Sequence, residues 1–206
     1  MKKSSAFTVL LLSLCLVFTS FKVPPPGLNV GDKAPDFKLK NVDGSMKSLA
    51  DYKSAKGIIL IFTCNHCPFS VAYEDRILAL DQQYAPKGFP VVAINPNDAV
   101  SVPEDSWDNM VIRAKDKKFT FAYLYDEGQN IAQTYGAART PHVFLLQKVG
   151  ADFVVKYIGA IDDNTDNPDQ VKNRYVEDAI NDVLGGKPVA VPFTKAIGCT
   201  VKWKKA

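Results

Sequence analysis

Apolar runs and amphipathic segments alternate along most of this chain. Five short runs are almost wholly apolar, which predicts buried strands at 57–63, 91–95, 121–125, 142–146 and 153–158. Between or after them, apolar residues recur every three or four positions, which predicts helices with one buried face at 69–84, 103–114, 131–135 and 168–184. Strands that alternate with helices require crossover connections, so the pattern predicts an α/β fold built on a parallel sheet.

Two hairpins modify this plan. The short, turn-rich stretch at 30–49 contains Asp43-Gly44, a dipeptide typical of tight turns between antiparallel strands. The link at 148–151 around Gly150 is too short for a crossover, so the last two core strands are expected to be antiparallel. The sheet is therefore predicted to be mixed and flanked by helices.

The C-terminal tail has a pattern of its own. Ile197, Cys199, Val201 and Trp203 alternate with small or polar residues, which predicts a strand over 197–204 with one apolar face. Cys199 lies on that face. We therefore expect a buried, inert thiol there, with a redox role for Cys199 as the alternative.

The N-terminus differs from the rest of the chain. Lys2 and Lys3 precede an apolar run at 7–18, and small residues follow, which is the layout of a secretory signal peptide. The run is shorter than the roughly 20 residues of a membrane-spanning helix, so we expect no integral membrane domain. Export to the periplasm or another extracytoplasmic space is predicted, with attachment through an uncleaved N-terminus or a lipid on Cys15 as the alternative. The expected divisions are a leader at 1–20, a proline-rich spacer at 21–29 and one folded domain at 30–206 that ends in a tail at 187–206.

Composition narrows the class of protein. The chain has 206 residues, 47% hydrophobic and 23% charged, which is typical of one soluble globular domain with a substantial core. The formal net charge is only +3, and the basic residues are scattered apart from three lysines near the C-terminus. This distribution argues against a nucleic-acid partner.

The cysteine spacing points to redox chemistry. Cys64 and Cys67 are separated by two residues and lie between a predicted buried strand and a predicted helix. The free N–H groups at a helix start favour the thiolate, which is the attacking species in disulfide exchange. We expect Cys64 to be the nucleophile and Cys67 the more buried resolving partner. No resident cofactor or metal is expected.

His66 lies inside the cysteine pair. An imidazolium there would stabilise the Cys64 thiolate, so we expect the pKa of Cys64 to lie between about 3.5 and about 7. Replacing His66 is expected to raise that pKa and to lower the reduction potential. A solvent-exposed loop residue with little effect is the alternative for His66.

The strand, the Cys-x-x-Cys, the helix and a later Thr140-Pro141 at a strand start resemble the thioredoxin superfamily. The segment 31–37, Gly-Asp-Lys-Ala-Pro-Asp-Phe, is similar to the start of its alkyl hydroperoxide reductase/thiol-specific antioxidant (peroxiredoxin-like) branch. The helix and strand between 99 and 126 also fit that branch and its exported thioredoxin-like relatives. The resemblance covers about 30–184, and the tail is like that of peroxiredoxin-like members. It implies a thioredoxin-like fold with an inserted helix and strand.

The resemblance also implies roles for particular residues. Cys64 and Cys67 would be the redox pair, Pro141 a cis-proline that faces the disulfide, and Thr140 a donor of backbone hydrogen bonds to a substrate chain. The implied function is a thiol–disulfide oxidoreductase that acts on extracytoplasmic protein thiols or disulfides and is recycled by a redox partner. The chain departs from the thioredoxin pattern at Thr63, where tryptophan is usual, and in the Asn-His interior of the pair.

Two other functions fit parts of the pattern. A peroxiredoxin-like peroxidase would use one low-pKa cysteine, with Arg139 to stabilise the thiolate and Cys199 to resolve a sulfenic acid, although the peroxidase motif before the cysteine is broken. A copper or zinc carrier would use the two sulfurs and His66, with His142 as a further ligand.

Acidic residues follow the cysteine pair on the same predicted helix. Glu74 and Asp75 are expected to form salt bridges at the surface, with relay of the Cys67 proton as the alternative for either one. Trp107 and Trp203 lie on apolar stripes and are expected in the core.

Overall fold

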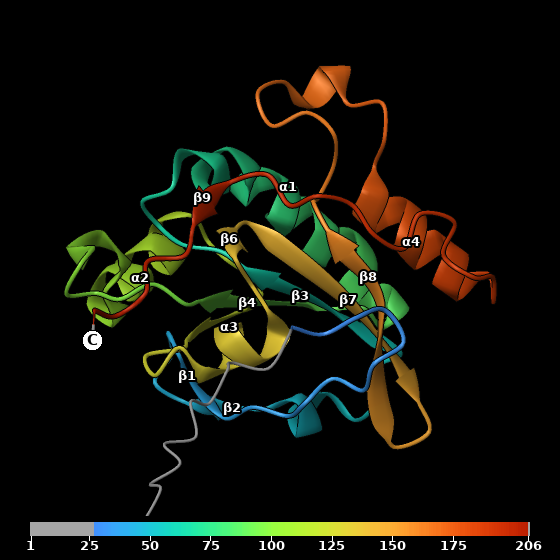
Figure 1. Cartoon of the computed structure of the whole chain (residues 1–206), viewed down its shortest axis with the longest axis horizontal. Helices are drawn as coiled ribbons and strands as arrows, with labels where there is room; N and C mark the ends of the chain where they lie inside the picture. The colour runs from blue at the N-terminus through green and yellow to red at the C-terminus, as the bar shows by residue number, and fades with distance from the viewer. Residues whose placement is uncertain (1–26, 206) are drawn as a thin grey trace, which may run out of the picture.

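A seven-stranded mixed sheet runs through the computed structural model, which describes residues 27–205, in the order β2-β1-β5-β4-β3-β7-β8 (Figure 1). The predicted leader, Cys15 and most of the predicted spacer lie outside the described residues. The strands of this sheet are β1 (Leu39–Asn41), β2 (Met46–Lys47), β3 (Gly57–Phe62), β4 (Val91–Asn95), β5 (Ala122–Tyr125), β7 (His142–Val149) and β8 (Asp152–Gly159). A second, two-stranded sheet pairs β6 (Arg139–Thr140) with β9 (Cys199–Thr200).

Helices cover both faces of the large sheet (Figure 1). They are α1 (Pro68–Tyr84), α2 (Trp107–Asp116), α3 (Asn130–Tyr135) and α4 (Tyr175–Leu184). The connections also contain short 3₁₀ turns, which are η1 (Leu49–Tyr52), η2 (Ala85–Lys87), η3 (Pro103–Asp105) and η4 (Pro168–Gln170). The parallel trio β3, β4 and β5 is linked by α1 and α2, as the alternation predicts. The predicted α/β class, mixed sheet and flanking helices are confirmed.

β3 is buried on both faces and holds the centre of the molecule. Ile59 and Ile61 pack in one core cluster with α1 and α4, whereas Ile58, Leu60 and Phe62 pack in the other cluster with α3. Successive side chains of a strand point to opposite faces, so an apolar run with no alternation requires helices on both sides. The strand that leads into the Cys-x-x-Cys is therefore held by two cores.

Both predicted hairpins are present. β1 pairs with β2 across the turn that contains Gly44, whose φ is +85°. β7 pairs with β8 across Gly150, whose φ is +62°. Both values lie in the left-handed region that glycine adopts without strain.

Two predicted helices begin differently in the structure. The Asn167 side chain accepts a hydrogen bond from the Asp169 N–H, so Asn167 caps the short 3₁₀ turn η4 and not the long helix. The Asp163 carboxylate then accepts the N–H groups of Lys172 and Asn173, which keeps them out of a helical ladder, and α4 begins only at Tyr175. The helix predicted from 103 likewise begins with the separate turn η3, ahead of α2.

The tail forms much less strand than its alternation predicts. Only Cys199–Thr200 is a strand, because β6 offers a two-residue edge for pairing. Beyond it, Val201 is buried, but Trp203 is 40% exposed, so the core position expected for Trp203 is wrong. Trp107 is half-buried, and its ring N–H donates to the Asn41 carbonyl.

Within residues 27–205, no helix is both long and apolar enough to cross a bilayer.

Candidate active site

The Cys-x-x-Cys lies where the chain passes from β3 into α1. Cys67 is the N-cap residue of α1 and Pro68 occupies the first helical turn, a position that suits proline because no N–H partner is needed there. Cys64 is 3% exposed and Cys67 is fully buried. The Cys64 and Cys67 sulfurs lie 3.2 Å and 3.3 Å from oxygen atoms of one residue, Thr140. The two cysteines are thus close together at the start of a helix.

Thr140 faces both cysteines from the opposite side. The Thr140–Pro141 peptide bond is cis, so the predicted isomer is confirmed. The Thr140 hydroxyl oxygen lies 3.2 Å from the Cys64 Sγ, and the Thr140 carbonyl oxygen lies 3.3 Å from the Cys67 Sγ. Ser70, one turn into α1, places its Oγ 3.8 Å from the Cys64 Sγ. One residue before the cis bond therefore touches both sulfurs.

The disulfide in the structure is not the one expected. Cys67 is bonded to Cys199, 132 residues further along the chain, with their Cα atoms 6.1 Å apart. Cys64 is a free, buried thiol. Cys199 is half-buried and bonded, so the expected inert, buried thiol is wrong. The alternative, a redox role for Cys199, stays a prediction. In the sequence, only the presence of a third cysteine in the predicted folded domain could have indicated the Cys67–Cys199 bond.

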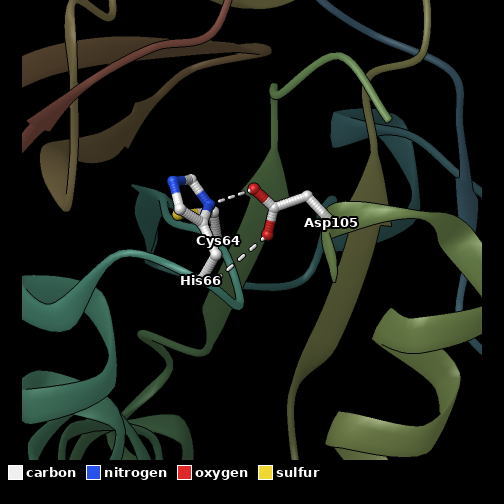
Figure 2. A group of neighbouring side chains, drawn as sticks. All are labelled: Cys64, His66 and Asp105. Atoms are coloured by element: carbon white, nitrogen blue, oxygen red, sulfur yellow. Dashed lines mark hydrogen bonds and ion pairs between the residues drawn. The ribbon is translucent and has the colours of Figure 1, made fainter. Parts of the chain in front are cut away.

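His66 is held by the carboxylate of Asp105, a residue that the sequence analysis missed. Its Nδ1 lies 2.5 Å from the Asp105 Oδ2, and the fully buried Asp105 belongs to η3 (Figure 2). The other oxygen, Oδ1, accepts the backbone N–H groups of Asn65 at 2.7 Å and of His66 at 3.2 Å. Asn97 donates its side-chain N–H to Oδ2 at 2.7 Å. Asp105 therefore fixes both the backbone of the Asn-His dipeptide and the imidazole ring.

The electrostatics of Cys64 differ from the prediction. Burial, followed by the negative charge of Asp105, raises the pKa of the Cys64 thiol above its ordinary value. Hydrogen bonding with Thr140, the Cys67 backbone and Ser70 offsets this only in part. The expectation of a pKa below about 7 omitted both the buried environment and the Asp105 charge.

Three side chains of the types that bind metals lie close together in the site. Ligand atoms of Cys64, His66 and Asp105 all lie within 4.8 Å of one another. The Asp105 carboxylate already accepts four hydrogen bonds, which is about its full capacity. Cys67 is engaged in a disulfide, so the ligand set expected for a metal carrier is not assembled. Cys64, His66 and Asp105 instead resemble a catalytic arrangement in which a thiol lies beside a base and a carboxylate orients that base.

Two predicted candidates, His142 and Arg139, contact other groups. His142 is buried beside Phe144 and lines a separate cavity with Arg139 and Lys195. Arg139 donates to the Gly198 carbonyl at 2.7 Å and so supports the tail, whereas its expected role toward a peroxidatic thiolate stays a prediction.

Glu74 and Asp75, the two acidic candidates in α1, differ in burial. Glu74 is buried and pairs with Arg113 at 2.6 Å and Lys117 at 3.1 Å, so its salt bridges are confirmed but its surface position is wrong. Asp75 is exposed.

Comparison with known families decides the classification. Residues 29–175 match the Redoxin family model. The chain belongs to the Redoxin family. This membership confirms the predicted place in the thioredoxin superfamily, peroxiredoxin-like branch, and the predicted oxidoreductase class.

Individual Redoxin-like proteins extend the comparison. The thiol-disulfide oxidoreductase ResA of Geobacillus thermodenitrificans is 27% identical over 151 residues, which cover 69% of this chain and 80% of ResA. An uncharacterized conserved protein from Geobacillus kaustophilus, known from a crystal structure, is 39% identical in sequence and superposes with a TM-score of 0.80. The match covers 86% of this chain and 94% of that protein's chain. Peroxidoxin BcpB from Mycobacterium tuberculosis shares the fold at 19% identity and a TM-score of 0.53, over 63% of this chain and 83% of its own.

Proposed function

We propose that this Redoxin-family chain is a thiol–disulfide oxidoreductase that acts on protein cysteines outside the cytoplasm through Cys64 and Cys67. The observation that carries the proposal is the free Cys64 thiol, which lies between Ser70 and Thr140 and beside a second cysteine at the start of α1. Thiol–disulfide exchange requires an attacking sulfur with a resolving sulfur in reach. The similarity to ResA supports the same class of reaction.

The exchange proceeds through a mixed disulfide. The Cys64 thiolate attacks one sulfur of a substrate disulfide, and the other substrate sulfur leaves with the electron pair. Reduced Cys67 then attacks Cys64, forms the Cys64–Cys67 disulfide and releases the second substrate sulfur. The reverse sequence oxidises a substrate dithiol.

His66 is suited to handle the proton of Cys64. When its Nδ1 donates to Asp105, its Nε2 is left free to accept a proton. A ring nitrogen lies within 4.8 Å of the Cys64 sulfur. The raised pKa of Cys64 makes such a base useful, because little thiolate forms at neutral pH without one.

Thr140 and the cis Pro141 are proposed to position the reaction. Thr140 contacts both sulfurs, and Pro141 separates β6 from β7 directly after it. The extracytoplasmic location rests on the leader pattern at 1–20. A redox partner is required there, because an oxidising compartment would otherwise hold the cysteines in one state.

Turnover of a disulfide-bonded fluorogenic peptide, with dithiothreitol as the reductant, tests the function. The wild-type protein is expected to cleave the peptide much faster than dithiothreitol alone. Cys64→Ser is expected to reduce the protein-dependent rate by about 100-fold or more, because the nucleophile is removed. Ser45→Ala, at an exposed position in the turn between β1 and β2, is the control and should retain the wild-type rate. A Cys64→Ser variant as fast as wild type would refute the proposal.

A further inference from the structure

The C-terminal strap, residues 196–204, crosses the active site and presents Cys199 to it. Its strand β9 pairs antiparallel with β6, with Thr140 opposite Cys199 and Arg139 opposite Thr200 (Figure 1). Thr140 is the residue that touches both active-site sulfurs. The main-chain edge beside the sulfurs is thus occupied by an extended, cysteine-bearing segment of this same chain.

The strap fits this edge through a glycine. A Cβ atom on Gly198 would lie 2.1 Å from the Thr140 carbonyl oxygen, so no other residue could approach as closely. The Arg139 guanidinium holds the Gly198 carbonyl at 2.7 Å. On the other side of Cys199, the Val201 N–H donates to the Ala138 carbonyl at 3.1 Å. Contacts on both sides of Cys199 therefore aim its sulfur at Cys67.

We propose that Cys199 is a third redox cysteine and that the strap is a built-in substrate, bound on the edge where an extended substrate peptide binds. This inference rests on the proposed function, since it names the exchange partner and the peptide-binding edge of the same site. An antiparallel strand added to an open edge is a common mode of peptide recognition. The substrate class it implies is an extended segment with a cysteine, preceded by a residue small enough to lie against Thr140.

The exchange within the chain is balanced. The Cys64 thiolate attacks the Cys67 sulfur, the Cys64–Cys67 bond forms and the Cys67–Cys199 bond breaks. The electron pair leaves on the Cys199 sulfur, which takes up the proton that Cys64 lost. One disulfide and one thiol are present before and after, so no outside oxidant or reductant is needed. The products are a Cys64–Cys67 disulfide and a strap that is no longer covalently held.

Disulfide mapping of the oxidised protein tests this exchange without any substrate. Free thiols are blocked at low pH, and the remaining disulfide is located by peptide mass spectrometry. Wild type is expected to contain both the Cys67–Cys199 and Cys64–Cys67 bonds, in a ratio that re-establishes itself after partial reduction and reoxidation. Cys64→Ser is expected to contain only Cys67–Cys199, and Cys199→Ser only Cys64–Cys67.

Gly198→Val tests the docking of the strap while all three cysteines remain. The added side chain must push β9 away from Thr140, so the disulfide should shift toward Cys64–Cys67 by about tenfold or more. Thr200→Ala is the matched control, because Thr200 is exposed in the same strand and pairs only through its backbone. It should keep the wild-type ratio.

The results separate this inference from the proposed function. A Cys67–Cys199 bond that never exchanges with Cys64, or a Gly198→Val ratio equal to that of wild type, would identify the bond as a static crosslink and overturn the inference. The proposed function would still stand if Cys199→Ser cleaved the fluorogenic peptide. Exchange among the three cysteines without any peptide cleavage would instead support the inference while refuting the proposed activity.

Discussion

The active-site turn at 63–68 and the C-terminal strap meet at the same sulfurs but are held in different ways. The turn follows β3, whose side chains are fully buried in two core clusters, and the carboxylate of Asp105 fixes its backbone. The strap buries few side chains, among them Val201, and leaves Ile197 and Trp203 exposed. It is attached mainly by main-chain hydrogen bonds and one disulfide.

This difference separates a fixed part from a releasable part. A buried aliphatic side chain contributes several kcal/mol, whereas a typical hydrogen bond contributes about 1 kcal/mol net because water replaces the lost partner. The Lys202 and Lys204 N–H groups, for example, donate to the side chains of Asn97 and Gln129, at 2.8 Å each. Detaching the strap exchanges such bonds for bonds to water and leaves both cores intact.

The largest effect is expected in the strand behind the turn. Ile61→Ala removes a fully buried side chain from β3 and leaves a cavity, so the free energy of unfolding should fall by about 2–5 kcal/mol. Urea denaturation followed by circular dichroism measures this loss. A change below about 1 kcal/mol would contradict the view that β3 anchors the turn.

A pH-dependent loss of similar size is expected at His142, which pairs with Phe62 directly behind the turn. Burial lowers the pKa of His142 to about 4, whereas the unfolded value is about 6.5. The unfolded chain therefore binds the additional proton first as the pH falls. Stability should be fully present above pH 6.5 and should decline between about pH 6.5 and 4 by roughly 3 kcal/mol.

His142→Phe isolates this contribution. The variant cannot titrate at this position, so its stability should be flatter than that of wild type between pH 6.5 and 4. Urea midpoints measured across this range for both proteins provide the comparison. Parallel wild-type and variant curves would show that His142 is not the group responsible.

Asp105→Asn is expected to loosen the turn and change its thiol. The amide has one acceptor oxygen where the carboxylate has two, so the free energy of unfolding should fall by about 1–3 kcal/mol. Loss of the negative charge should also lower the pKa of Cys64, because Asp105 raises it. The pH dependence of Cys64 alkylation measures this shift. Asp108→Asn, at an exposed position in α2, is the control and should leave the Cys64 pKa unchanged. An unchanged or higher Cys64 pKa in Asp105→Asn would contradict the account.

The smallest effect is expected in the strap. Trp203→Ala removes a large but substantially exposed side chain, so the free energy of unfolding should change by less than about 0.5 kcal/mol. Thermal unfolding compares it with Ile61→Ala. A loss as large as that of Ile61→Ala would abolish the distinction between a fixed turn and a releasable strap.

The sequence predicted those features that are carried by local patterns. The apolar run before Cys64, the amphipathic helix after Cys67 and the turn at Gly150 specify strand, helix and hairpin without any distant contact. Thr140-Pro141 was found through resemblance, and its cis bond is confirmed.

The remaining features depend on tertiary contacts. Asp105 is 39 residues from His66 along the chain, and nothing in its neighbours marks it as the carboxylate that reaches the imidazole. The pairing of Cys67 with Cys199 depends on β6, a two-residue strand too short to leave a periodic signal. The raised pKa of Cys64 follows from burial and from the Asp105 charge, both of which exist only in the folded chain.

Trapping of the mixed disulfide tests the central claim, that Cys64 attacks and Cys67 resolves. The double variant Cys67→Ser/Cys199→Ser and the single variant Cys199→Ser are each mixed with a disulfide-bonded peptide and mapped by mass spectrometry. The double variant is predicted to accumulate the peptide on Cys64, and the single variant to release it and form the Cys64–Cys67 disulfide. Absence of a Cys64 adduct in the double variant, or an adduct of equal lifetime in both, would contradict the account.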